Sequence, residues 1–206
     1  MTRLISIAAA AVLVALIGGL WLSTLYKNPD DQFAECGSGQ IAGGTSQIGG
    51  PFELVNSKGE TVTDKDVLTG PSLIYFGYTF CPDVCPLDNA RNAEAIDILE
   101  SQDHMVTPVF ISIDPGRDTP EVVGDFAYNL HERMIGLTGS LEQVKAASQA
   151  YKTYYKAHEA EDEFYLVDHS TFTYLVLPGH GFVKHYNRNE TPEDMARSIM
   201  CYMDHS

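Results

Sequence analysis

The sequence predicts an α/β domain with a mixed central sheet flanked by helices, carried behind an N-terminal transmembrane helix. Three observations lead to this fold class. Short apolar runs alternate with segments of helical spacing, two apolar runs near the C-terminus are separated only by a turn, and a long uncharged run precedes the rest. Alternating strands and helices indicate a sheet covered on both faces. The closing hairpin adds antiparallel strands and makes the sheet mixed.

The uncharged run extends from Leu4 to Tyr26 and is almost wholly apolar. A membrane-spanning helix needs about 20 such residues. Arg3 precedes the run and acidic residues follow it, so the positive-inside rule places the N-terminus in the cytoplasm and the body outside. A cleaved signal peptide is the alternative. The run exceeds the usual apolar region of about 7–15 residues, and no good small-residue cleavage site lies near its end, so we expect an uncleaved anchor.

Three parts are expected along the chain. Residues 1–27 form the membrane anchor, and residues 28–50 are polar and Gly-rich, which is typical of a flexible tether. Residues 51–206 form the domain. The body beyond position 27 carries 11 basic and 28 acidic side chains, a net charge of −17. This charge argues against nucleic acid as a partner, because nucleic-acid binding needs a basic face.

The elements of the domain are predicted from apolar runs, turn residues and helix caps. Thr119 caps a helix that has Pro120 in its first position, and Ser140 with Gln143 forms a capping box. In chain order we expect a hairpin Phe52–Val55 and Glu60–Thr63 turning at Lys58-Gly59, a strand Ser72–Tyr78, a helix Leu87–Glu100, a strand Val106–Ile113, a helix from Thr119, a strand Met134–Leu137, a helix Ser140–Ala150, a hairpin Phe172–Leu177 and Phe182–Tyr186, and a helix Thr191–Met203.

Cys81 and Cys85 follow the first buried strand and precede its helix. A dithiol loop in this place is the thioredoxin-like arrangement. Pro86 fits the first turn of a helix, which predicts Cys85 as the cap residue. Both sulfurs then lie near the positive end of a helix dipole, where the pKa of a thiol falls. The pair could bind a metal ion, run disulfide chemistry, or form a plain structural disulfide.

His169 is a candidate third ligand, because a loop that enters the strand at Phe172 faces the dithiol loop in a thioredoxin-like sheet. Two soft sulfur ligands and one borderline nitrogen suit copper, Cu(I) above all. Disulfide exchange by the same two thiols is the other use that the residues allow. Among seven histidines, a surface role for His169 is the simple alternative.

Four segments resemble the signature of the Sco/SenC/PrrC copper-chaperone family. They occur in family order and cover most of the chain from about Phe52: Tyr75–Pro86 (YFGYTFCPDVCP), Ser112–Pro120 (SIDPGRDTP), Gly136–Gly139 (GLTG) and Val167–Ser170 (VDHS). The N-terminal anchor is similar to that of the family as well. Family members often have more polar or acidic turn residues where this chain has Leu177 and His180, a departure that touches a hairpin and not the ligands.

The resemblance implies a thioredoxin-like fold and a site that binds Cu(I) or Cu(II) through Cys81, Cys85 and His169. It implies a role in assembling the dinuclear copper centre of cytochrome c oxidase, by handing over copper, by reducing the recipient cysteines, or both. Expected partners are the copper-receiving subunit of the oxidase, other copper carriers and thiol reductants. Asp83 and Asp168 match family positions beside the site, where they could orient a ligand or add charge. The implied location is the inner (cytoplasmic) membrane, with the domain in the periplasm or the equivalent intermembrane space.

Two other functions use the same site. In a thiol–disulfide oxidoreductase, Cys81 is the attacking thiol and Cys85 the resolving one, and His169 is not needed as a ligand. In a copper or redox sensor, the site is a switch read by a partner. A carrier is not itself an enzyme, so enzyme activity is expected only as thiol–disulfide reduction.

The remaining cysteines, Cys36 and Cys201, lie outside the family motif. Two unpaired thiols in an oxidising compartment could cross-link or capture copper at the wrong place. The tether is long enough for Cys36 to reach the surface of the final helix. We therefore predict a Cys36–Cys201 disulfide.

Overall fold

The computed structural model describes residues 12–19, 32–36, 47–158 and 164–206. Residues 12–19 are helical. Within the described ranges, no helix combines the length and apolar composition that crossing a bilayer requires. The predicted anchor, residues 1–27, lies mostly outside these ranges, as does much of the predicted tether. Residues Glu35–Ser206 form one compact unit, and the site lies within it.

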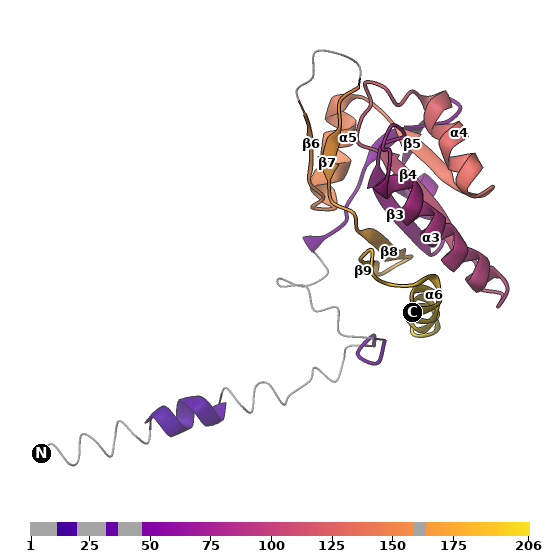
Figure 1. Cartoon of the computed structure of the whole chain (residues 1–206). Coiled ribbons are helices and arrows are strands. Elements are labelled where there is room, and N and C mark those ends of the chain that lie inside the picture. The colour runs from indigo at the N-terminus through magenta and orange to yellow at the C-terminus, as the bar shows by residue number, and fades with distance from the viewer. Residues whose placement is uncertain (1–11, 20–31, 37–46, 159–163) are drawn as a thin grey trace, which may run out of the picture. The chain divides into compact units, whose positions relative to one another are not determined.

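The centre of this unit is a seven-stranded mixed sheet in the order β2-β1-β5-β4-β3-β8-β9 (Figure 1). The three inner strands β3, β4 and β5 run parallel, and the outer pairs are antiparallel. The prediction of a mixed sheet closed by a hairpin is confirmed. The strands of the sheet are β1 (Glu53–Asn56), β2 (Thr61–Thr63), β3 (Ser72–Gly77), β4 (Thr107–Ser112), β5 (Ile135–Thr138), β8 (Thr173–Leu177) and β9 (Gly181–Tyr186).

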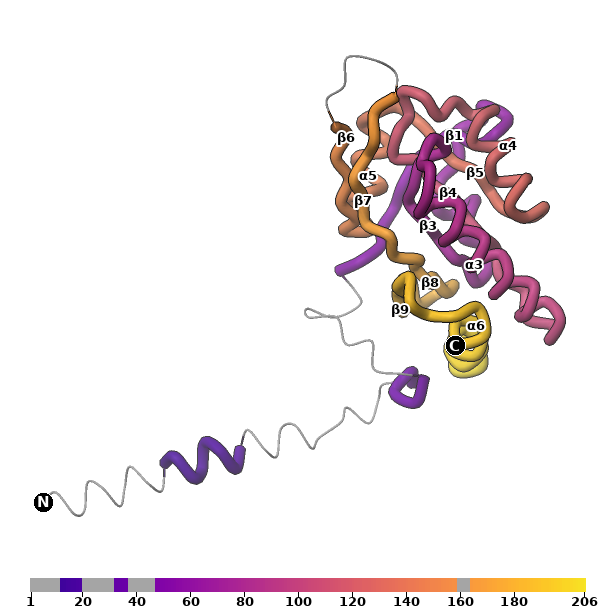
Figure 2. The backbone as a smooth tube through the Cα atoms, in the orientation of Figure 1, coloured from indigo at the N-terminus to yellow at the C-terminus, as the bar shows by residue number. Residues whose placement is uncertain are grey.

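Helices cover both faces of the sheet, as the buried central strands require. All six residues of β3 are buried, which is the pattern of a strand packed on both sides. Helix α3 packs against both α4 and α6, whereas α5 packs against β1 (Figures 1 and 2). The helices are α2 (Asp64–Val67), α3 (Val84–Glu100), α4 (Pro120–Leu130), α5 (Leu141–Ala150) and α6 (Pro192–Asp204).

The predicted helix starts at Thr119, Ser140 and Thr191 are confirmed, because each hydroxyl accepts the backbone N–H of the residue three positions further along the chain. Two features were not predicted. Helix α2 is one turn after β2, and a separate two-stranded ribbon pairs β6 (Tyr155–Ala157) with β7 (Val167–His169). The ribbon matters for function, since it carries His169.

The start of α3 differs from the prediction. The helix begins at Val84 with Asp83 in the cap position, so Cys85 is its second residue and Pro86 its third. The prediction of Cys85 as cap residue is therefore wrong. The physical reason is that none of the first helical N–H groups has an intrahelical partner, so proline is tolerated at the third position as well as the first.

Candidate metal centre

Cys81 and Cys85 lie where the buried strand β3 meets helix α3. Strand β3 ends at Gly77, and a six-residue loop leads to the helix. The side chain of Cys81 is 8% exposed and that of Cys85 is fully buried. Both belong to the hydrophobic core of the domain. The site is thus a continuation of the core, and Cys81 is the less deeply buried of the two thiols.

Gly77 makes room for the buried thiol. A Cβ atom at this position would lie 2.9 Å from Cys85 Sγ and 2.9 Å from the ring of Tyr75. Contacts of this length are shorter than packed carbon and sulfur atoms tolerate. The glycine at the end of β3 is therefore a packing requirement of the site.

The sulfur of Cys81 replaces the missing cap of α3. Asp83 makes no side-chain cap hydrogen bond. Instead, the backbone N–H of Cys85 donates to Cys81 Sγ across 3.3 Å. A sulfur at the N-terminus of a helix is stabilised as thiolate by such N–H groups and by the helix dipole.

The pKa values of the two thiols are shifted in opposite directions. The hydrogen bond from the Cys85 thiol lowers the pKa of Cys81 to about 4, and the backbone N–H groups of Asp83 and Cys85 act in the same direction. Burial opposes this shift but does not cancel it. The pKa of Cys85 is raised, because its proton is held in the hydrogen bond to Cys81 and because the thiol is buried. Apo protein at neutral pH thus holds one thiolate and one thiol.

His169 meets the cysteines from strand β7. Its Nε2 atom lies 3.3 Å from Cys85 Sγ. Its Nδ1 atom lies 2.8 Å from the carbonyl oxygen of Ser170. A carbonyl oxygen only accepts hydrogen bonds, so Nδ1 carries the proton and the lone pair of the neutral imidazole is on Nε2, toward the sulfurs. The ring also stands edge-on to Tyr75 and Tyr78, at centroid distances of 6.2 and 5.8 Å.

One atom each from Cys81, Cys85 and His169 lies within 4.8 Å of the other two. The structure thus brings together the three side chains that were predicted as ligands. Two sulfurs and one imidazole nitrogen are the donor set that selects soft cations such as Cu(I). A metal ion between them would exchange the S–H···S hydrogen bond for two metal–thiolate bonds and release the Cys85 proton.

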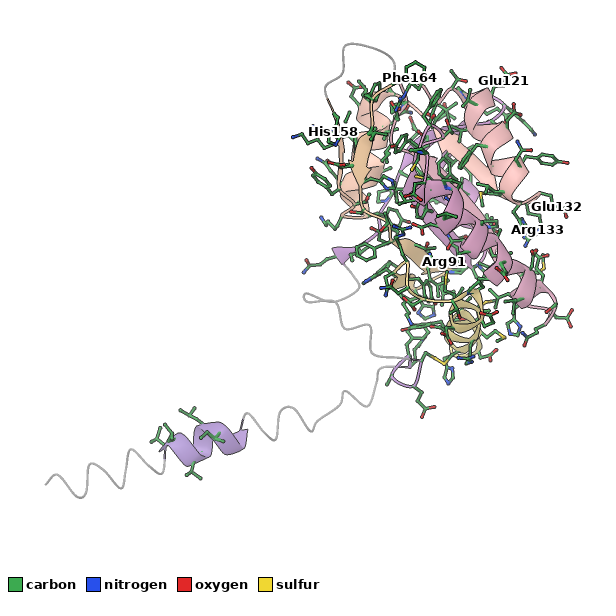
Figure 3. The ribbon with its side chains drawn as sticks, in the orientation of Figure 1. Arg91, Glu121, Glu132, Arg133, His158 and Phe164 are labelled. Atoms are coloured by element: carbon green, nitrogen blue, oxygen red, sulfur yellow. A yellow bond between two sulfur atoms is a disulfide. The ribbon has the colours of Figure 1, made fainter. Side chains whose placement is uncertain are left out.

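The two aspartates predicted beside the site have other roles. Asp168 neighbours His169 in β7 and is exposed, and its carboxylate pairs with His158 Nε2 at 2.9 Å. Since neighbouring residues of a strand point to opposite faces, Asp168 does not orient the imidazole, and the Ser170 carbonyl does so. Asp83 contributes its backbone N–H rather than its exposed carboxylate. His158, the partner of Asp168, lies at the periphery of the domain, as Phe164 does (Figure 3).

Residues that the sequence analysis missed hold the loop in place. Asp118 is fully buried and accepts hydrogen bonds from the backbone and hydroxyl of Thr79 and from the hydroxyl of Ser112. Val167 N–H donates to the hydroxyl of Tyr78 across 3.3 Å, which joins β7 to the cysteine loop. No local pattern reveals these pairs, because the partners are far apart in sequence.

The arrangement defines a class of protein: an α/β protein of thioredoxin-like fold with a dithiol–imidazole centre suited to a soft metal ion or to disulfide exchange. The chain belongs to the SCO1/SenC family, whose model matches residues 41–204. It is 49% identical to protein SenC of Rhodobacter capsulatus over 199 residues, which is 97% of this chain and 90% of SenC. The chain spans about half the length of two mitochondrial SCO1 homologues. It covers 47% of the Arabidopsis thaliana protein and 54% of the human protein.

Solved structures of relatives share the fold. Arabidopsis thaliana ScoI with copper bound is 42% identical and superimposes with a TM-score of 0.72, over 76% of this chain and 99% of that one. A structure of BsSco is 27% identical with a TM-score of 0.57, over 72% of this chain and 92% of that one. That structure identifies a disulfide switch in BsSco, which is a member of the Sco family of cytochrome c oxidase assembly proteins.

Proposed function

We propose that this chain is a membrane-anchored copper chaperone that serves the assembly of cytochrome c oxidase. Cys81, Cys85 and His169 hold the copper, which the protein delivers to the copper-receiving subunit of the oxidase. The observation that carries the proposal is the 3.3 Å approach of His169 Nε2 to Cys85 Sγ from a separate strand ribbon. Disulfide chemistry alone does not need this imidazole. The copper-bound structure of a relative that is 42% identical supports the choice of metal.

The site suits a carrier that must release its cargo. Three protein ligands leave room for a ligand from the recipient, which allows copper to pass by stepwise exchange of donors. Cys81 keeps 8% of its surface exposed, and the exposed apolar side chains of Phe80 and Leu87 flank the two cysteines along the chain. A partner that covers these side chains would bury apolar area and exclude water while the metal moves.

The remaining parts of the proposal rest on the sequence. Residues 1–27 anchor the chain in the inner (cytoplasmic) membrane as a single-pass helix, residues 28–50 are a tether, and residues 51–206 are the copper-binding domain. The domain lies on the periplasmic side or in the equivalent intermembrane space. An oxidising compartment agrees with a Cys36–Cys201 disulfide.

Copper binding to the reduced full-length chain, in a non-ionic detergent, tests the proposal. In a Cys36→Ser/Cys201→Ser background, which lacks the second thiol pair, the chain should bind one Cu(I) tightly, and adding His169→Ala should weaken binding severely while Cys81 and Cys85 remain oxidisable. The matched control is His158→Ala, because His158 lies on the same ribbon but is exposed and pairs with Asp168. Wild-type copper affinity in His169→Ala would contradict the three-ligand site.

A second candidate function is reduction of the recipient's cysteines. The thiolate of Cys81 attacks a recipient disulfide, and Cys85 then resolves the mixed disulfide, so two electrons leave this chain as its own Cys81–Cys85 disulfide forms. The lowered pKa of Cys81 and the raised pKa of the more deeply buried Cys85 favour this order of attack. Because copper and the disulfide need the same sulfurs, oxidised chain should lose tight Cu(I) binding. Retention of one tight Cu(I) by oxidised chain would place the copper site elsewhere.

A further inference from the structure

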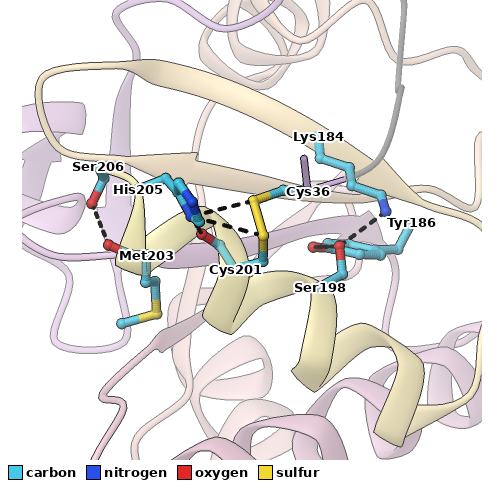
Figure 4. Close-up of a disulfide and its surroundings, with 8 residues drawn as sticks. All are labelled: Cys36, Lys184, Tyr186, Ser198, Cys201, Met203, His205 and Ser206. Carbon is cyan, nitrogen blue, oxygen red and sulfur yellow. Dashed lines mark hydrogen bonds between the residues drawn. A yellow bond between two sulfur atoms is a disulfide. The ribbon is translucent and has the colours of Figure 1, made fainter. Parts of the chain in front are cut away.

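A second cluster of metal-ligating side chains lies around the predicted disulfide, which the structure contains. Cys36 and Cys201 are bonded, with their Cα atoms 5.4 Å apart. His205 Nδ1 lies 3.6 Å from Cys36 Sγ and 3.9 Å from Cys201 Sγ (Figure 4). We propose that two-electron reduction of the Cys36–Cys201 disulfide creates a second metal site, in which Cys36, Cys201 and His205 bind a thiophilic d¹⁰ cation, Zn²⁺ or Cu(I). This inference does not depend on the copper site at Cys81.

The positions of the three side chains follow from helix α6. Cys201 and His205 are four residues apart, so they share one face of the helix end. The imidazole is held over the sulfurs, because its Nδ1 also lies 2.8 Å from the carbonyl oxygen of Cys201. This carbonyl also accepts the backbone N–H of His205 at 3.3 Å, so the ring and the backbone of His205 meet the same oxygen in the last turn. The helix terminus thus orients the ring before any metal is present.

The distances fit a metal site. Bonds of about 2.3 Å to sulfur and about 2.0–2.1 Å to nitrogen, at tetrahedral or trigonal angles, separate a sulfur from a nitrogen ligand by about 3.6–3.8 Å. The observed separations from His205 Nδ1 are 3.6 and 3.9 Å. Only the two sulfurs must move apart, and cleavage of their bond allows this. The ring proton then moves through solvent from Nδ1 to Nε2, and Nδ1 exchanges its hydrogen bond to the Cys201 carbonyl for a bond to the metal.

A reductant can reach the Cys36–Cys201 disulfide through Cys201, and the exchange reaction balances. Cys36 is buried, whereas Cys201 is partly exposed on α6. The thiolate of an external dithiol attacks Cys201 Sγ, the bond to Cys36 breaks, and Cys36 leaves as a thiolate. The second thiol of the dithiol then attacks the mixed disulfide and releases Cys201, so the reagent takes the disulfide and the chain gains two thiols. A bound cation displaces their protons and links Cys36 to α6 in place of the lost covalent bond.

The test uses a full-length Cys81→Ser/Cys85→Ser double variant in detergent, since this chain lacks the first site. After anaerobic reduction with a phosphine, titration with Co²⁺ should give one bound ion per chain, with thiolate-to-cobalt charge-transfer bands and the ligand-field bands of tetrahedral cobalt. Zn²⁺ should displace the cobalt stoichiometrically. The unreduced variant should bind none, and adding Cys201→Ser should abolish binding in the reduced one.

His205→Ala separates a built site from two free thiols. It should lower the Co²⁺ affinity at least about tenfold, as expected for loss of a metal-site group. His104→Ala is the matched control, because His104 contacts the same helix end through Asp204, at 3.4 Å, outside the cluster. Absence of Co²⁺ uptake by the reduced variant, equal affinity in His205→Ala, or a disulfide that resists reduction until the chain unfolds would each overturn the proposal.

Discussion

The carboxylate of Asp118 holds Thr79 by two hydrogen bonds across 39 residues of sequence. Thr79 donates its backbone N–H to Oδ2, at 3.0 Å, and its hydroxyl to Oδ1. Ser112 at the end of β4 donates to the same carboxylate at 2.6 Å. Thr79 is two residues before Cys81, so this buried carboxylate fixes the cysteine loop to the neighbouring strand. The ligand geometry therefore depends on a residue that does not touch the metal site.

We expect Asp118→Asn to destabilise the domain and to weaken copper binding. The amide presents N–H donors to groups that themselves donate, which leaves buried hydrogen bonds unmade at a cost of about 1–3 kcal/mol each. Urea unfolding of the reduced apo protein and Cu(I) competition measure the two effects. Asp125→Asn on the exposed side of α4 is the control and should change neither. Unchanged copper affinity in Asp118→Asn would show that the loop is positioned without it.

Gly77→Ala tests the packing of the buried thiol. The added Cβ would meet Cys85 Sγ and the Tyr75 ring at 2.9 Å, so the thiol must shift. Overpacking of this kind costs about 1–3 kcal/mol, and the displaced sulfur should lower Cu(I) affinity. Gly70→Ala is the matched control, because a Cβ there meets nothing within 4 Å. If both variants bind copper like the wild type, the thiol has more freedom than the structure indicates.

The order of the main strands and helices was predictable, because buried strands, capping residues and turn glycines are local signals. The dithiol loop was visible for the same reason. The approach of His169 was expected from the topology and the family resemblance, not from its own neighbourhood. The Cys36–Cys201 pairing was reached by elimination, and the structure confirms it.

The elements that were missed lack a local signal. Strands β6 and β7 have three residues each, and Lys156 and Ala157 in β6 are exposed, so no run or alternation marks the ribbon. Asp118 lies in the family-like segment Ser112–Pro120, but no local pattern identifies its partners Thr79 and Ser112, which explain its burial. The start of α3 was misplaced because proline fits more than one position in a first turn.

Loss of the Cys36–Cys201 disulfide should destabilise the domain. The bond joins residues 165 apart in sequence. In the chain-entropy model, closing so long a loop stabilises the folded state by about 5 kcal/mol. The double variant Cys36→Ser/Cys201→Ser should lose stability by that amount in urea unfolding without added reductant, while its Cu(I) affinity at Cys81 and Cys85 stays the same. Equal stability of variant and wild type would mean that the link adds nothing to the folded state.

The pH dependence of the reduced apo protein should follow Cys81. Because its folded-state pKa is lowered to about 4 from an ordinary value of 9.0, the thiolate is present at neutral pH. Its absorbance near 240 nm should disappear as the pH falls toward about 4, and Cys81→Ser should lack it. Cys85→Ala should raise the midpoint, since it removes the thiol that donates to the Cys81 sulfur.

The lowered pKa of Cys81 also makes the free energy of unfolding depend on pH. Between the two pKa values the unfolded chain binds one proton more than the folded chain at Cys81, so the free energy of unfolding rises with pH in this window. The contribution of Cys81 is present above pH 9 and is lost as the pH falls to about 4. In this window Cys85, whose pKa is raised, keeps its proton in both states and adds no slope. The difference in unfolding free energy between wild type and Cys81→Ser should therefore grow from pH 5 to pH 8, and a constant difference would contradict the lowered pKa.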